Sequence, residues 1–259
     1  MQIKSIVTPI LHPPHDDLFE VIRAAVTTMP ERSVLVVTSK VVSIWEGRCV
    51  AVDAVTDKDT LAIQESDTYV PRGETPHGWC LHTMKHNLFV PSAGIDRSNA
   101  ANYYILWPKD PTASAERIWR WCRDTYGVTE LGVLITDSHS VPLRRGVVGI
   151  SLGHYGFEPL RDYRNTPDLF GRELKVTQTN IADGLAAAAV LIMGEGAEST
   201  PLVQMTDVPH IQFVSTPLVS TKRYSSFEVP PTEDMYAPFF ASLPWKQGGG
   251  GVSTTEVGQ

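Results

Sequence analysis

Acidic and basic side chains follow one another closely after the apolar run 131–135, in a pattern suited to nucleotide chemistry. The run predicts a buried strand that ends at Asp137 and Ser138, where a sheet meets its loops. Arg144 and Arg145 come seven and eight residues after the aspartate, and guanidinium groups suit phosphate or carboxylate ligands. Adjacent side chains in an extended segment point in opposite directions, so at most one arginine should face a given ligand, with Arg144 preferred.

Three predicted loops carry an acidic residue directly after an apolar segment. These residues are Asp96, Asp137 and Glu195, and Mg²⁺ or Mn²⁺ takes hard oxygen ligands of this kind. Ser138 and Asn99 could supply further oxygens or hold phosphates. The alternative is that Asp96 caps a turn and Asp137 caps a helix start, and spacing alone leaves both interpretations open.

The β-branched run 33–39 predicts a central strand that delivers Ser39 and Lys40 to one edge of a sheet, followed by a loop. Lys40 could neutralise a phosphate there, although a lysine in this place is more often simply exposed. Trp45 lies beside this proposed phosphate loop, whereas Trp107, Trp119 and Trp121 are interpreted as core side chains, as tryptophan at helical or strand spacing usually is. His139 and His154 flank the arginine pair, and neither is assigned a role, because an unpartnered histidine is more often structural.

The sequence contains neither a GxxxxGK[ST] loop nor a GxGxxG turn after a strand. P-loop and Rossmann nucleotide sites are therefore excluded, and any nucleotide site must be of another type. The formal net charge of −7 argues against nucleic acid as a partner. Three widely spaced cysteines show no zinc pattern, and no apolar run is long enough to span a membrane, so we expect a soluble cytoplasmic protein.

The remaining pattern predicts a mixed α+β fold with mixed sheets and covering helices. One catalytic domain, undivided or of two subdomains, is expected over residues 1–242, followed by a flexible glycine-rich tail over 243–259. Residues 52–87 are polar and predicted to be irregular. The other expected elements are strands at 3–10 and 88–90, helices at 18–28 and 110–126, and a buried helix at 181–193 ending at Gly194. A loop is expected at 92–99, and it carries the polar residues Asp96, Ser98 and Asn99.

The segment 161–173 is charged and rich in turn residues. It is interpreted as a surface for a partner or substrate, and an ordinary network of ion pairs explains it equally well.

Several long motifs together resemble the coenzyme F420:L-glutamate ligase (gamma-glutamyl ligase) family, in order over roughly residues 3 to 210. The motifs are VLVVTSKVVSIWEGR, SAGIDRSNA, VPLRRGVVG, DLFGRELKVT and ADGLAAAAVLIMGEG. The resemblance implies a family-specific ligase fold, in an intertwined homodimer. It also implies a GTP- or ATP-dependent enzyme that joins L-glutamate to an acid-bearing deazaflavin or folate acceptor through an acyl phosphate. Mg²⁺ or Mn²⁺ would assist the reaction, with K⁺ as a further candidate ion.

Position by position, the resemblance assigns metal binding to Asp96 and Asp137, to Ser138 where the family usually has threonine, and to Glu195. Arg144 or Arg145 would neutralise charge on the transferred phosphate. The remaining assigned positions are nucleotide contacts, and they are Pro9, Ile10, Leu11, His12, Ser39, Lys40, Asn99, Ile192, Met193, Gly194 and Gly196.

Two departures from the family pattern affect the expected acceptor and nucleotide preference. Ile44 stands where the deazaflavin enzymes commonly have lysine, and a DTxGR pattern becomes DSHSV. The chain looks closer to a bacterial branch described as folate-metabolism gamma-glutamate ligases. A non-catalytic homologue that binds nucleotide or pterin, and an amide ligase for another small acid, are the alternative functions.

Overall fold

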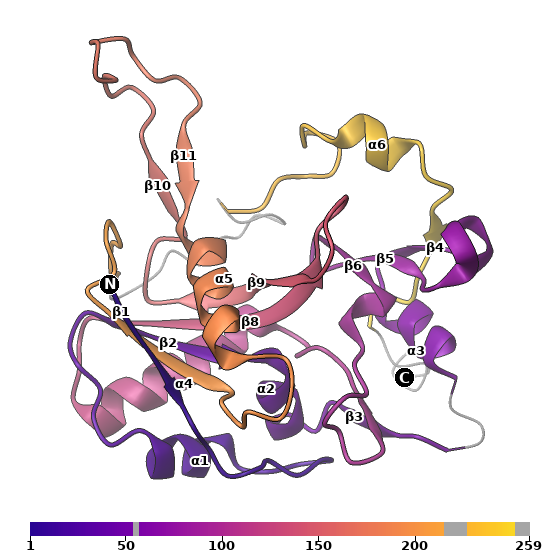
Figure 1. The fold of residues 1–259 in the computed structure, drawn as a ribbon, viewed down its shortest axis with the longest axis horizontal. Helices are drawn as coiled ribbons and strands as arrows, with labels where there is room; N and C mark the ends of the chain where they lie inside the picture. The colour runs from indigo at the N-terminus through magenta and orange to yellow at the C-terminus, as the bar shows by residue number, and fades with distance from the viewer. Residues whose placement is uncertain (54–56, 215–226, 252–259) are drawn as a thin grey trace, which may run out of the picture.

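The computed structural model describes residues 1–53, 57–214 and 227–251. Its central element is a five-stranded sheet in the order β1-β12-β2-β8-β9 (Figure 1). β2 and β8 run parallel, and the other neighbours are antiparallel. The strands are β1 (Gln2–Ile6), β2 (Ser33–Thr38), β8 (Leu131–Ser140), β9 (Val147–Tyr155) and β12 (Leu202–Thr206).

Helices cover both faces of this sheet, and the alternation of side chains along β2 shows why. Leu35 and Val37 pack into a core with α1 (Leu18–Ala25), α2 (Ser39–Trp45) and α4 (Pro111–Tyr126). Val34 and Val36 pack on the opposite face, against α5 (Ile181–Met193). Burial on both faces explains the unbroken apolar run 34–37 of this strand.

A second sheet, in the order β13-β4-β5-β6, has its own smaller core under α3 (Lys58–Glu65). Its strands are β4 (Thr68–Val70), β5 (His82–Lys85), β6 (Leu88–Pro91) and β13 (Lys246–Gln247). Two short pairs complete the sheets, β3 (Cys49–Ala51) with β7 (Tyr103–Ile105) and β10 (Leu160–Asp162) with β11 (Gln178–Asn180). Short helical turns are η1 (Arg72–Glu74), η2 (Pro76–Gly78), η3 (Ser92–Gly94) and α6 (Ala237–Ala241).

These mixed sheets with covering helices confirm the predicted α+β class. The long helices also agree with the sequence: α4 begins after the capping side chain of Asp110, and α5 ends before Gly194. α5 is less buried than predicted, because Leu191 in its last turn is 83% exposed. Within the described ranges, no helix has both the length and the apolar character that a membrane crossing requires.

Three segments differ from the sequence-based prediction. The stretch after Lys40 is helix α2 and not a loop, and it was missed because residues 41–45 are all buried and show no polar face. Residues 52–87 contain α3, β4 and β5, which are too short to give a periodic signal. In the predicted tail, β13 pairs with β4 and Gly249 donates to the Ile63 carbonyl at 2.9 Å, whereas residues 252–259 lie outside the described part.

We expect the stability of the fold to decrease in acid because of His154 on β9. Its ring packs against Phe157 and Phe227 at centroid distances of 5.3 and 5.9 Å, and burial lowers its pKa to about 4. Because the folded pKa lies below the unfolded one, this histidine destabilises the folded state progressively as pH falls from about 6.5 to 4. We expect His154→Leu to remove up to about 3 kcal/mol of that loss.

Urea unfolding of both proteins between pH 7 and pH 4 measures the effect. His210→Asn is the control, because His210 is exposed and asparagine tolerates its positive φ of 64°. Parallel losses of stability in the wild type and His154→Leu would contradict the assignment.

Candidate functional site

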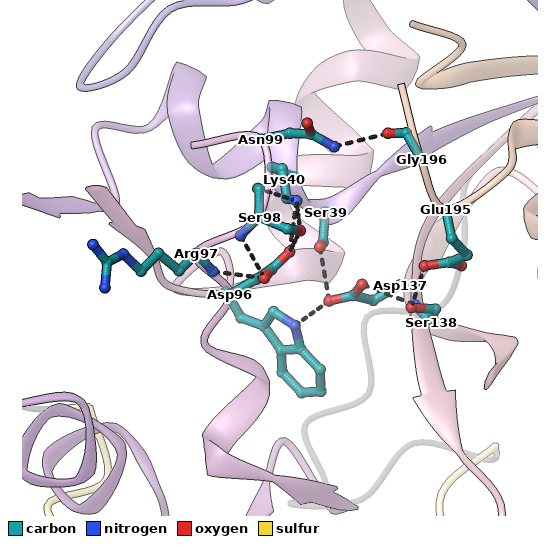
Figure 2. Close-up of polar contacts among 11 residues, drawn as sticks. Ser39, Lys40, Asp96, Arg97, Ser98, Asn99, Asp137, Ser138, Glu195 and Gly196 are labelled. Carbon is teal, nitrogen blue, oxygen red and sulfur yellow. Dashed lines mark hydrogen bonds and ion pairs between the residues drawn. The ribbon is translucent and has the colours of Figure 1, made fainter. Parts of the chain in front are cut away.

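The candidate site lies where β2 ends beside its parallel neighbour β8, which itself continues to Ser140 and so ends later than predicted. Thr38 pairs with Thr136, so the next residues, Ser39 and Asp137, meet at the same edge of the sheet. The Ser39 hydroxyl donates a hydrogen bond to Asp137 Oδ2 at 3.0 Å (Figure 2). The predicted delivery of Ser39 and Lys40 to this edge is therefore confirmed.

Asp137 is surrounded by hydrogen-bond donors and partly removed from solvent. Besides Ser39, the Trp107 indole N–H donates to Oδ2, and the Ser138 backbone N–H donates to Oδ1 at 2.8 Å. Burial raises the pKa of Asp137 to about 6, and these hydrogen bonds only partly oppose it. Asp137 does not start a helix, since β8 continues through Ser140.

Asp96 belongs to the loop after η3, and protein donors occupy both of its oxygens. Oδ1 accepts from the backbone N–H groups of Arg97 and Ser98 at 2.6 and 2.9 Å, so Asp96 does cap a turn. Oδ2 accepts from Lys40 Nζ and the Ser98 hydroxyl, each at 2.6 Å (Figure 2). Burial alone would raise the pKa of Asp96, but the hydrogen bonds from Lys40 and Ser98 lower it to about 2.

The loop after α5 closes the site from the other face of the sheet. Glu195 accepts a hydrogen bond from the Ser138 hydroxyl at 3.2 Å, and the Gly196 carbonyl accepts from the Asn99 side chain at 2.8 Å. Figure 2 shows Asp137 between Asp96 on one side and Ser138 with Glu195 on the other. Thus the structure joins three of the predicted loops through side-chain contacts.

The predicted nucleotide segment Pro9–His12 lies beside the same loop. The Thr8 backbone N–H donates to the Ser199 carbonyl at 3.0 Å, which fixes this turn against residues 194–199. Leu11 is buried, whereas Ile10 is 69% exposed. The predicted nucleotide residues therefore come from four chain segments that are linked to one another by hydrogen bonds.

The oxygen donors around Ser138 fit a magnesium or manganese ion with few protein ligands. No group of three or more His, Cys, Asp or Glu side chains in the described residues is arranged to hold a metal. Asp137 and Glu195 nevertheless both contact Ser138, and all three side chains offer hard oxygens. Mg²⁺ typically binds one or two carboxylates together with water and substrate phosphates, which is what this donor set allows.

Arg144 and Arg145 lie apart from this cluster. Both are exposed in the turn between β8 and β9, and within the described ranges neither guanidinium has an ion pair or hydrogen bond. The turn begins four residues beyond Asp137, about 13 Å along an extended strand. Their catalytic role stays a prediction. Ile44 is 2% exposed in the core, so the side chain at this departure from the family pattern does not face the site.

Two residues of the cluster were not assigned by sequence reasoning. Trp107 was interpreted as a core side chain, and it is only 2% exposed, yet its indole reaches Asp137. Ser98 was noted only as a polar loop residue, although the run Asp-Arg-Ser has the spacing of a turn in which aspartate accepts from the second following residue. That spacing could have identified Ser98, whereas nothing local distinguishes Trp107.

Comparisons with known proteins agree with the resemblance seen in the sequence. A family model described as F420-0:Gamma-glutamyl ligase matches residues 5–207. Coenzyme F420:L-glutamate ligase of Methanopyrus kandleri is 36% identical over 207 residues, covering 73% of this chain and 80% of the relative. The enzymes of the same description from Methanothermobacter thermautotrophicus and Archaeoglobus fulgidus are 32% and 34% identical, covering 68% and 73% of this chain and 75% and 80% of their own lengths.

The family match spans every loop of the cluster, from the turn at Thr8 to the segment after Glu195. The chain therefore belongs to the F420-0:gamma-glutamyl ligase family, and it is an amide-bond-forming ligase.

Proposed function

We propose that this enzyme uses GTP or ATP to join L-glutamate to the carboxylate of a cofactor acceptor, either a coenzyme F420 precursor or a folate. The observation that carries the proposal is the meeting of Ser39, Lys40 and Asp137 where β2 ends beside β8, next to the loop of Glu195. Ligands of open α/β sheets bind at such strand ends. The acceptor rests on the family resemblance alone, and its identity is the first thing to measure.

Amide formation from a carboxylate requires that one carboxylate oxygen leave. The acceptor carboxylate would attack the terminal phosphorus of the nucleotide, forming an acyl phosphate and releasing the nucleoside diphosphate. The glutamate amine would then attack the acyl carbon, the C–O bond to phosphate would break, and a proton would leave the nitrogen. Lys40 is the cation placed to neutralise phosphate charge, once it exchanges its present partner Asp96.

Asp137, Glu195 and Ser138 would hold a divalent metal, and Asp96 would join them when Lys40 releases it. The bound metal would neutralise charge on the transferred phosphoryl group. The neighbouring residues would position the two carboxylates. Ser39 and Trp107 hold Asp137 through hydrogen bonds. Ser98 and the turn after Asp96 keep the Asp96 carboxylate facing Lys40.

The test couples nucleotide hydrolysis to product mass. Purified protein is incubated with Mg²⁺ or Mn²⁺, GTP or ATP, L-glutamate, and either the glutamate-free deazaflavin or a reduced folate. A gain of one glutamate residue on one acceptor, with equal release of phosphate, is the expected result. Glutamate-independent binding of nucleotide without turnover would favour the non-catalytic homologue. Hydrolysis with another carboxylic acid alone would favour a different amide ligase.

We also expect a homodimer, and the hairpin of β10 and β11 supplies the argument. It projects from the body of the molecule (Figure 1) and carries Leu169, Phe170 and Val176 at 98%, 95% and 85% exposure. Several apolar side chains exposed together on one projecting element mark a protein contact surface, whereas a single exposed apolar side chain is normal. Light scattering should give twice the chain mass for the wild type and the chain mass for Phe170→Asp, with Leu191→Asp, an exposed leucine on α5, as the control. A monomeric wild type would contradict this expectation.

A further inference from the structure

Trp107 is a buried residue with a polar contact inside the site. It is 2% exposed, and its Nε1–H donates to Asp137 Oδ2, which also accepts from the Ser39 hydroxyl at 3.0 Å. An indole has a single donor and no acceptor, so its position fixes where the partner oxygen lies. The ring therefore constrains a carboxylate as well as filling the core.

Neighbouring residues hold the indole in place on several sides. A Cβ on Gly94 would lie 2.1 Å from the ring, so only glycine permits this approach of the loop that carries Asp96. The His86 ring stacks on the indole with centroids 6.2 Å apart and planes inclined by 13°. Arg48 Nε donates to the Trp107 carbonyl at 3.1 Å, and Nη2 of the same side chain forms an ion pair with the buried Glu65 at 2.6 Å.

The hydrogen bonds of Asp137 distinguish its two oxygens. Oδ2 accepts from Ser39 and Trp107, which uses both of its lone pairs. Among the described residues, Oδ1 accepts from the Ser138 N–H alone, at 2.8 Å, and so retains one lone pair. That free lone pair belongs to the oxygen bonded by Ser138, whose own hydroxyl reaches Glu195 at 3.2 Å.

We propose that Trp107 is a positioning residue that holds Asp137 so that only Oδ1 is available to a divalent metal ion. The inference rests on the proposed function, because it requires the metal at Asp137 and Glu195. Residues that orient a metal ligand through hydrogen bonds raise metal affinity, and their loss typically costs about 10- to 100-fold. Trp107 acts through Asp137 and touches no reacting group.

The test measures Mn²⁺ binding by the paramagnetic resonance signal of the free ion, without nucleotide, on the full chain. Trp107→Phe should weaken binding by about 10- to 100-fold while retaining cooperative unfolding. Trp119→Phe is the matched control, because Trp119 is also buried and its Nε1–H also donates a hydrogen bond, to the Leu131 carbonyl at 2.7 Å. That variant should bind Mn²⁺ within about twofold of the wild type, since Trp119 does not contact Asp137.

Replacing Trp107 by benzothienylalanine separates the hydrogen bond from the packing, because this residue keeps the bicyclic ring and lacks the N–H. It should lose Mn²⁺ affinity as Trp107→Phe does, and it remains informative if the phenylalanine variant fails to fold. Wild-type affinity in the benzothienylalanine protein would overturn the inference and leave the metal assignment standing. If the wild type binds no Mn²⁺ either alone or with a non-hydrolysable GTP analogue, the metal assignment falls, and the inference falls with it.

Discussion

Asp137→Asn should lower glutamate-dependent turnover by at least about a thousandfold at saturating Mg²⁺. The amide removes the negative charge, and it offers one acceptor oxygen to three donors, Trp107, Ser39 and the Ser138 N–H. One amide nitrogen must then face a donor, so the side chain cannot keep both its orientation and its hydrogen bonds. The measurement is initial rate against Mg²⁺ concentration for the acceptor that gives a product.

The matched control is Asp59→Asn, which removes a charge from the partly buried ion pair with Arg72 at 2.6 Å, away from the cluster. Its turnover should stay within about threefold of the wild type, because Asp59 contacts no residue of the site. Substantial turnover by Asp137→Asn at saturating Mg²⁺, in a folded protein, would show that Asp137 is not a metal ligand.

The fold was predictable where one element is long enough to show its burial pattern. The run 33–39 is apolar on both sides because β2 is buried between two helical layers, and α4 has a capping aspartate and a clear apolar face. α2 was not predictable, since all of residues 41–45 are buried and a helix without a polar face has no period to detect. The second sheet consists of strands of two to four residues, whose pairing is set by contacts distant in sequence.

Most residues of the site could be predicted from the sequence, but the contacts between them could not. Strand ends and the family motifs identified Asp137, Lys40 and Glu195, and the structure brings their loops together. The ion pair between Lys40 and Asp96 spans 56 positions, and neither local spacing nor composition indicates it. Trp107 was assigned to the core for the same reason: burial was evident from its type, but its partner lies 30 residues away.

Lys40→Gln should lower kcat/KM for the nucleotide by about 100- to 1,000-fold and leave the KM for glutamate nearly unchanged. In the structure Nζ has three acceptors, Asp96 Oδ2 at 2.6 Å and the Ser98 carbonyl and hydroxyl at 2.8 and 3.1 Å. Glutamine keeps hydrogen-bonding capacity but removes the charge that a phosphate would require. Lys40→Arg should recover part of the loss, and Lys4→Gln, an exposed lysine on β1, should behave as the wild type.

The same lysine should also make the effects of two substitutions non-additive. While Nζ is bound to Asp96, that carboxylate has no free lone pair, so a phosphate that attracts Lys40 would release Asp96 Oδ2 for the metal. Lys40→Gln and Asp96→Asn interrupt one exchange, so the double variant should lose little more activity than the more impaired single variant. If the activity losses of the two single variants multiply in the double variant, Lys40 and Asp96 have independent roles. Reduced thermal stability of Lys40→Gln with unchanged nucleotide kcat/KM would mean that Lys40 only holds the loop.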